Sequence, residues 1–303
     1  MMAQPVTLAL PPERAFRWAC CMDLRALKPG NVAASRPGHG MSGRDFLLSA
    51  RRSAPALCRV EARLGARILE AARATREAVG CNTNLGILLL CAPLLMAAQT
   101  RTGEQDLQPV VAGLLGTDDL RDTEDLFQAI RVAAPGGLGD APRHDVNQPA
   151  EAPLLAAMTE AAHRDRVAAQ YLDGFRDLLG AKRRALLRDW RRWQSLTWAT
   201  TALYLRFLAE GPDSHTLRRQ GAPLARRVME QAAPLADAVA ASEDPTAFRE
   251  RLLVFDRQLH AEGINPGTCA DLTVATLCAA LLEPDPGVRR RYSPSAVSGR
   301  ARS

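Results

Sequence analysis

Apolar residues recur at helical spacing along almost the whole chain. Residues three and four positions apart lie on one face of a helix, so this repeat predicts amphipathic helices packed on one another. The predicted helices cover the ranges 13–27, 44–56, 60–79, 85–98, 107–115, 123–132, 153–179, 185–209, 216–232, 245–261 and 268–282. Alternating apolar and polar runs of strand length are not found, and aromatic residues make up only 5% of the sequence. The chain is therefore predicted to be all-α.

The range 85–98 is apolar on every side, which predicts a helix surrounded by other helices. It is shorter than the roughly 20 residues that cross a bilayer, so no membrane span is expected. Because such a helix needs neighbours from both halves of the chain, we predict one bundle-like domain over 13–283. The Pro- and Gly-rich loop 133–149 is its main interruption and could alternatively link two lobes. Residues 1–12 are assigned to an N-terminal extension and residues 284–303 to a disordered basic tail.

Composition is that of a globular protein, with 303 residues, 47% of them hydrophobic and 24% charged. The seven cysteines are odd in number and show no C-x-x-C spacing, which indicates free thiols in a reducing compartment. The first residues have no basic start before their short apolar run, so a signal peptide is not expected. These features predict a cytoplasmic protein.

Lysine is almost absent from the chain. Only Lys28 and Lys182 are lysines among its 39 lysine and arginine residues. A lysine kept in such a chain suggests a place where a compact ammonium cannot be replaced by a planar guanidinium. Lys28 is therefore the first candidate for a functional residue.

Four polar loops lie at the ends of apolar helices. In the first, Lys28 and Gly30–Asn31 could offer an ammonium and backbone N–H groups to a phosphate, and His39 follows; the alternative is a plain helix end. In the second, Asn82, Thr83 and Asn84 precede the most apolar helix. One of these residues suffices for a cap, which leaves two for an anion or a substrate hydroxyl at the positive end of the helix.

The third and fourth loops each precede a predicted helix. Asp213 or Ser214 is a plausible N-cap of the third, and His215 is either a solvated residue or a titrating group. The fourth contains Asp271 in the first turn of an apolar helix, where a carboxylate suits the helix dipole but can also bind a metal ion.

Taken together, these motifs resemble one family. The matching segments are Lys28-Pro29-Gly30-x-Val32, Asn82-Thr83-x-x-Gly86, Asp213-Ser214 with Gly221, and Pro266-Gly267-Thr268-x-Ala270-Asp271-Leu272. Over residues 15–282 the chain resembles triphosphoribosyl-dephospho-CoA synthase. The resemblance implies an all-α transferase that moves the triphosphoribosyl group of ATP to the 2′-hydroxyl of 3′-dephospho-CoA and releases adenine. The product would be the precursor of the prosthetic group of citrate lyase or malonate decarboxylase.

The chain departs from the family pattern in three places. Leu85 stands where the family often has lysine, no aspartate follows shortly after His39, and residues 135–139 replace an Arg-Gly-Glu segment. The residues of these motifs are similar to those of a divergent branch of the family in methylotrophs. The alternative is therefore a repurposed member that acts on a phosphorylated or nucleotide substrate in tetrahydromethanopterin-type cofactor biosynthesis.

The resemblance also suggests roles for single residues. Cleaving a ribose–adenine bond requires neutralised phosphates, an acid for the base that leaves and a base for the hydroxyl that attacks. Asp271 and Asp213 are expected to hold Mg²⁺ on the triphosphate of ATP, and His215, His39 or Asp213 to act in catalysis. The expected substrate-binding residues are Lys28, Gly30, Asn31, Asn82, Thr83, Asn84, Asn265, Gly267 and Thr268.

A nucleic-acid-binding protein is the alternative of another class. The net charge is +6, and six basic residues cluster in 182–192 beside Trp190 and Trp193. That cluster and five arginines in 284–303 account for the positive excess, so the helical body is not basic. Nucleic acid is therefore not expected to be the ligand. The sequence predicts no oligomeric state.

Overall fold

The structure is a computed structural model that describes residues 9–283 except residues 35, 104 and 118. The described part contains fourteen α-helices and no β-strand, which confirms the all-α prediction. The helices are α1 (Pro12–Arg25), α2 (Gly43–Leu57), α3 (Leu64–Val79), α4 (Leu85–Thr100), α5 (Leu107–Leu115), α6 (Leu120–Ala133), α7 (Leu154–Ala161), α8 (Arg166–Leu172), α9 (Arg183–Trp193), α10 (Leu196–Glu210), α11 (Ser214–Gln220), α12 (Ala222–Ala241), α13 (Arg249–Ala261) and α14 (Gly267–Leu282).

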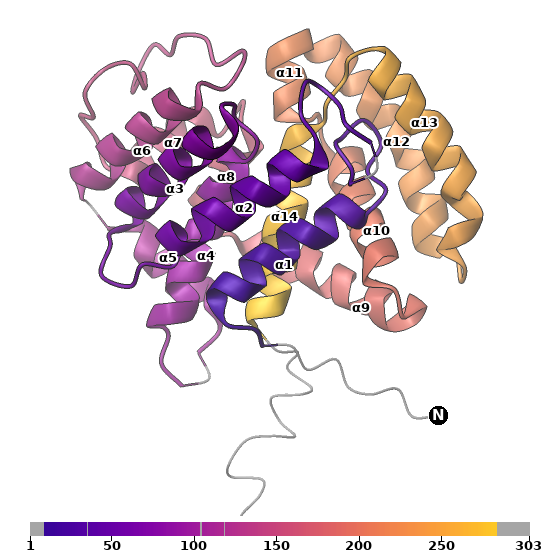
Figure 1. Cartoon of the computed structure of the whole chain (residues 1–303), viewed down its shortest axis with the longest axis horizontal. Coiled ribbons are helices and arrows are strands. Elements are labelled where there is room, and N and C mark those ends of the chain that lie inside the picture. The colour runs from indigo at the N-terminus through magenta and orange to yellow at the C-terminus, as the bar shows by residue number, and fades with distance from the viewer. Residues whose placement is uncertain (1–8, 35, 104, 118, 284–303) are drawn as a thin grey trace, which may run out of the picture.

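Two apolar helices form the centre of the molecule. Helix α4 packs against α1, α3 and α14, and Leu90, Leu94 and Leu95 are completely buried, as its apolar pattern predicts. Helix α14 is buried along nearly its whole length and lies between α3–α8 on one side and α10–α13 on the other (Figure 1). The N-termini of these two helices therefore lie inside the protein, where the positive end of each helix dipole acts on the polar groups around it.

Three predicted helices are interrupted. The prediction of one helix over 153–179 is wrong, because Asp165 caps a new helix and Phe175 takes a left-handed conformation with φ of 62°. The range 185–209 is divided at Gln194, with φ of 50°, before the Ser195 cap of α10. The range 216–232 is divided at Gly221, with φ of 90°. A residue with positive φ ends a helix regardless of the apolar repeat around it.

The loop predicted at 133–149 is present between α6 and α7. It reaches α11, where Gly136 and Gly137 lie against Arg219. The tail 284–303 and residues 1–8 lie outside the described residues, but the N-terminal extension is anchored where Leu10 N–H donates to the Leu281 carbonyl. None of the described helices is long and apolar enough to span a bilayer. All seven cysteines are free thiols, as predicted.

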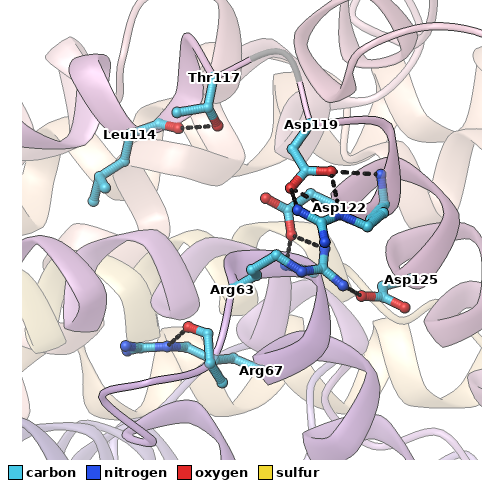
Figure 2. Close-up of polar contacts among 10 residues, drawn as sticks. Arg63, Arg67, Leu114, Thr117, Asp119, Asp122 and Asp125 are labelled. Atoms are coloured by element: carbon cyan, nitrogen blue, oxygen red, sulfur yellow. Dashed lines mark hydrogen bonds and ion pairs between the residues drawn. The ribbon is translucent and has the colours of Figure 1, made fainter.

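An ion-pair cluster joins α3 to α6. Arg63 donates to Asp122 at 2.9 Å and to Asp125 at 2.8 Å, and Gly65 N–H donates to the Asp122 carboxylate as well (Figure 2). Asp119, the N-cap of α6, pairs with Arg121. Each carboxylate at the start of α6 thus has an arginine partner.

Candidate active site

The four polar loops surround one cavity of about 170 Å³. Most of the residues singled out from the sequence line it, while Lys28, Gly30, His39 and Asp213 do not. The residues that the structure brings together there are Asn31, Asn82, Thr83, Asn84, His215, Asn265, Gly267, Thr268 and Asp271.

Asp271 is placed by the two central helices. It lies in the second turn of α14, and its carboxylate packs against Gly86 in the first turn of α4. A Cβ atom at Gly86 would collide with that carboxylate, so glycine is required at this position for the two groups to approach. The carboxylate consequently faces the positive N-terminal end of α4 within the cavity.

No donor among the described residues forms a hydrogen bond with the Asp271 carboxylate. Burial raises its pKa well above the ordinary value, and the neighbouring Asp213, Asp23 and Asp165 carboxylates raise it further. Only Lys28 opposes this shift. A carboxylate held in this state is stabilised by a cation, because both desolvation and repulsion disfavour its charge.

Asp23 is a cavity residue that the sequence analysis missed. It lies in α1, is buried, and forms an ion pair with Lys28 through Oδ2. Its other oxygen, Oδ1, is buried with no hydrogen-bond partner among the described residues. Burial raises the pKa of Asp23, and Lys28 acts in the opposite direction. The available signal was an aspartate within an otherwise apolar helical face, five residues before Lys28.

Lys28 is buried and fixes the first loop. Its Nζ donates to Asp23 and, at 2.7 Å, to the Asn31 Oδ1 atom. Asn31 in turn donates to Asn265 at 2.9 Å, which links the first loop to the fourth. Lys28 is therefore placed to orient two cavity residues, and the structure does not place it on the cavity surface.

Gly30 also determines the shape of the first loop. Its φ is 81°, and a Cβ atom there would lie 2.9 Å from the Pro266 ring and 3.0 Å from the Ile264 carbonyl oxygen. Its N–H donates to buried Asp256 at 2.9 Å, and the preceding Pro29 carbonyl accepts from Tyr204 at 2.7 Å. Glycine permits both the left-handed conformation and the close approach of the fourth loop.

In the second loop, one of the three polar residues caps α4 and the other two do not, as the sequence predicts. Asn82 Oδ1 accepts from the N–H groups of Asn84 and Leu85 and so caps α4. Thr83 donates to Ser49 at 2.6 Å. Asn84 is buried in the cavity wall, and its Nδ2 has no hydrogen-bond partner among the described residues. The Asn84 Nδ2 atom is thus a free donor at the N-terminus of α4, the helix whose Gly86 packs against the Asp271 carboxylate.

Asp213 caps α11 and ties the third loop to the fourth. Its Oδ1 accepts from Thr216 N–H at 2.8 Å, and its Oδ2 accepts from Cys269 N–H at 2.8 Å. His215, two residues further along the chain, lines the cavity, and its backbone N–H donates to the Thr268 hydroxyl. Burial lowers the pKa of His215, with Arg218 and Arg219 acting in the same direction, while Asp213 raises it. This imidazole is therefore neutral at physiological pH.

His39 lies outside the cavity. Its ring stacks on His260 with centroids 5.3 Å apart, and Nε2 is 2.9 Å from the Gly30 carbonyl oxygen. Burial lowers its pKa. Of the two histidines named from the sequence, only His215 faces the cavity.

The protein alone does not form a complete metal site in its described part, where no group of three or more His, Cys, Asp or Glu residues could hold an ion. Both oxygens of Asp213 already accept backbone hydrogen bonds. The oxygens left for a cation are those of Asp271 and the unpartnered Oδ1 of Asp23. Such a set suits Mg²⁺ only if phosphates and water supply the other ligands.

Comparisons with known proteins agree with the fold. The family model described as ATP:dephospho-CoA triphosphoribosyl transferase matches residues 10–289. A crystal structure from Archaeoglobus fulgidus, assigned there as a triphosphoribosyl-dephospho-CoA synthase, is 26% identical, with a TM-score of 0.61 over 78% of this chain and 99% of that one. No curated protein matches the chain. Neither match supports the tetrahydromethanopterin or nucleic-acid alternatives.

The first, second and fourth motifs lie around one cavity, and the family model covers nearly the whole chain. The chain therefore belongs to the ATP:dephospho-CoA triphosphoribosyl transferase family.

Proposed function

We propose that this chain transfers the triphosphoribosyl group of ATP to the 2′-hydroxyl of 3′-dephospho-CoA within the cavity, releasing adenine. The observation that carries the proposal is the Asp271 carboxylate, which lies without a hydrogen-bond donor among the described residues at the N-terminus of α4. A protein maintains such a group at a cost in stability, which points to a role with a ligand. We propose that the reaction takes place in the cytoplasm, where ATP is available and the seven free cysteines would stay reduced.

Mg²⁺ on the triphosphate would satisfy the cavity's unpaired carboxylates. Asp271 and the free Oδ1 of Asp23 are the protein oxygens that would hold it, and Mg²⁺ commonly binds through one or two carboxylates plus substrate phosphates. When bound, the ion would neutralise charge on the triphosphate. Asp213 stabilises the loops around this site through its two backbone hydrogen bonds.

The remaining cavity residues would orient the substrates. The free Nδ2 of Asn84 is a donor for phosphate or ribose oxygens. The first-turn N–H groups of α4 and α14 that Asn82 and Asp213 do not cap are further donors. Arg218 also lines the cavity, and its buried Nε has no hydrogen-bond partner among the described residues. Arg218 thus offers a positive group in a cavity where Leu85 replaces the family lysine.

His215 is the base best placed for the transfer. The bond between ribose C1′ and the adenine nitrogen breaks with its electron pair leaving on adenine, and the acceptor oxygen bonds to C1′. His215, neutral because burial lowers its pKa, takes the proton of the acceptor hydroxyl. The adenine nitrogen that leaves takes up one proton from solvent, and protonated His215 returns its proton to solvent, so protons and charges balance.

The direct test is incubation of the protein with ATP, Mg²⁺ and 3′-dephospho-CoA, followed by mass spectrometry. We expect free adenine and the triphosphoribosyl adduct in equal amounts. If ATP and dephospho-CoA are both recovered unchanged while the folded protein is present in stoichiometric amount, the proposed function is wrong. His215→Gln serves as a matched variant, since it retains size and polarity but cannot act as a base.

A further inference from the structure

A second cavity of about 130 Å³ adjoins the first. It lies between α6, α7 and the loop 133–149, and the two cavities have a common wall. The residues that line both are Leu89, Ile130, Leu138, Asp165, Val167 and Arg218. A ligand in the second cavity can therefore reach groups held in the first.

The second cavity differs from the first in its surface chemistry. Its floor is apolar and includes Phe127 from α6 and Ala157 and Met158 from α7. The residues with free carboxylate or amide atoms described above do not line it. Asp165 lines both cavities, and its carboxylate is paired with Arg218 at 2.6 Å. An apolar floor of this kind suits an uncharged ring or chain rather than a triphosphate.

Arginines lie along the outer side of this cavity. Arg143 is in the loop and largely exposed, and Arg164 lies between α7 and α8. The acidic residues beside them are partly engaged, since Asp145 accepts backbone N–H groups of the loop and Glu160 is 4.0 Å from Arg143. The Arg164 side chain donates no hydrogen bond among the described residues, and its charge acts on Asp145, whose pKa is lowered by the backbone N–H groups it accepts and further by Arg164. The guanidinium groups are therefore available to a phosphate-bearing ligand.

We propose that the second cavity binds the acceptor, with the adenine base of an adenosine diphosphate ester on the apolar floor and its diphosphate at Arg143 and Arg164. The inference rests on the proposed function, because it divides donor and acceptor between the two cavities. In the acceptor, the base is attached to the ribose carbon next to the reacting 2′-hydroxyl. A base on the floor thus places that hydroxyl at the shared wall, beside the first cavity.

The alternative assignment is disfavoured by charge. The first cavity is lined by the carboxylates of Asp23, Asp165 and Asp271 and by one arginine, Arg218. The second is lined by Asp145, Glu160 and Asp165 but also by three arginines, so an acceptor diphosphate meets less uncompensated negative charge there. The donor brings a triphosphate that binds a metal ion, so the donor suits the first cavity. Donor and acceptor both contain adenine, so the phosphates distinguish them, and the acceptor's two phosphates suit the three arginines of the second cavity.

Filling the second cavity tests the assignment. Ala157→Phe adds a ring to its floor, and Ala156→Phe on the same helix, at an exposed position that lines neither cavity, is the matched control. We expect Ala157→Phe to raise the KM for dephospho-CoA at least about tenfold and to leave the KM for ATP within about twofold. An unchanged dephospho-CoA KM in a variant that folds, or an increase in the ATP KM alone, would overturn the proposal.

Removing the positive groups is an independent test that does not disturb the floor. The double variant Arg143→Gln with Arg164→Gln is expected to raise the dephospho-CoA KM about tenfold, with kcat and the ATP KM retained. Arg226→Gln, an exposed arginine on α12 that lines neither cavity, is the control and should change neither value. Equal effects of both substitutions would show general electrostatic attraction and contradict a built acceptor site.

Calorimetric titration with dephospho-CoA separates this proposal from the proposed function. Should the wild-type protein release no adenine, the function fails, but the acceptor site stands if dephospho-CoA binds the wild type and not Ala157→Phe. Adenine release together with identical dephospho-CoA affinities in the wild type and Ala157→Phe would retain the function and refute the acceptor site.

Discussion

Two groups of carboxylates in this molecule have opposite surroundings. At the start of α6, Asp122 and Asp125 are both bound by Arg63, and Asp119 is bound by Arg121 (Figure 2). In the cavity, Asp271 has no such partner among the described residues, although 37 of the chain's basic residues are arginines. Pairing is therefore readily available to this sequence and is absent where two buried helices meet.

The difference shows what each group contributes. An arginine beside a carboxylate offsets the cost of burying charge, so the cluster at α6 stabilises the contact between α3 and α6. Arginine beside Asp271 would occupy the oxygens that a metal-bound nucleotide needs. We infer that the cavity keeps Asp271 and the Oδ1 atom of Asp23 unpaired for a ligand and that the α6 cluster stabilises the fold.

The largest expected effect comes from Asp271→Asn. Losing the carboxylate should lower kcat/KM at least about 100-fold, because charge stabilisation at a developing ion pair is worth that much. The same variant should unfold at a higher temperature, since it removes a buried charge whose pKa is raised by burial. Steady-state kinetics and thermal melts measure the two effects.

Asp122→Asn is the matched control for this prediction. Burial raises the pKa of Asp122 as well, but its carboxylate accepts from Arg63 and from Gly65 N–H, whereas Asp271 has no donor among the described residues. Asp122→Asn weakens these bonds and leaves Arg63 paired only with Asp125, so it should lower the melting temperature while kcat/KM stays within about twofold. Loss of stability in Asp271→Asn, or loss of activity in Asp122→Asn, would remove the distinction between the two groups.

Next in size is Lys28→Arg. The ammonium is enclosed by Asp23 and Asn31, and a guanidinium would displace both, so kcat should fall by about tenfold or more. Lys182→Arg is the control because Lys182 is also buried and is bonded to Glu210, which lines neither cavity, whereas the partners of Lys28 line the first. Unchanged turnover in Lys28→Arg would contradict the need for a compact ammonium at this position.

A smaller effect is expected from Arg63→Ala, which breaks two ion pairs in the α6 cluster. Because the guanidinium is about one-third exposed, at 34%, the free energy of unfolding should fall by only about 1–2 kcal/mol. Denaturant titration measures this change, and kcat/KM should not move. A fall in activity at unchanged stability would place the cluster in the catalytic machinery.

The smallest effect is the pH dependence of the Asp271→Asn stability gain. A carboxyl group whose folded-state pKa is raised destabilises the fold as pH rises from its unfolded value, about 3.9, through the folded value. The variant's advantage should therefore vanish below about pH 4, widen as pH rises and then level off. Thermal melts in metal-free buffer test this pH dependence, and a stability advantage of the variant that grows toward low pH would contradict it.

Sequence periodicity was sufficient for the fold class and the buried α4, because apolar spacing reflects burial directly. It failed at residues 194 and 221, where one backbone conformation ends a helix without changing the apolar repeat. Polar loops beside apolar helices identified most of the cavity, since buried helix ends require polar partners. Lys28 was found by its rarity, but its contacts with Asp23 and Asn31 depend on tertiary packing.

Asp23 and the second cavity could not be predicted in the same way. Asp23 lies inside a helix, where an isolated aspartate is normally a surface residue. The second cavity is lined by α6, α7 and the loop between them, but its wall also includes Leu89 from α4, Val167 from α8 and Arg218 from α11, which meet these elements only in the fold.

Calorimetric titration of ATP, with and without Mg²⁺, tests the role of the unpaired carboxylates most directly. In the wild type we predict that Mg²⁺ increases ATP affinity at least about tenfold, and in Asp271→Asn that it has little effect. Equal Mg²⁺-dependent affinities in the two proteins would contradict the claim that Asp271 is kept unpaired to bind the metal–nucleotide complex.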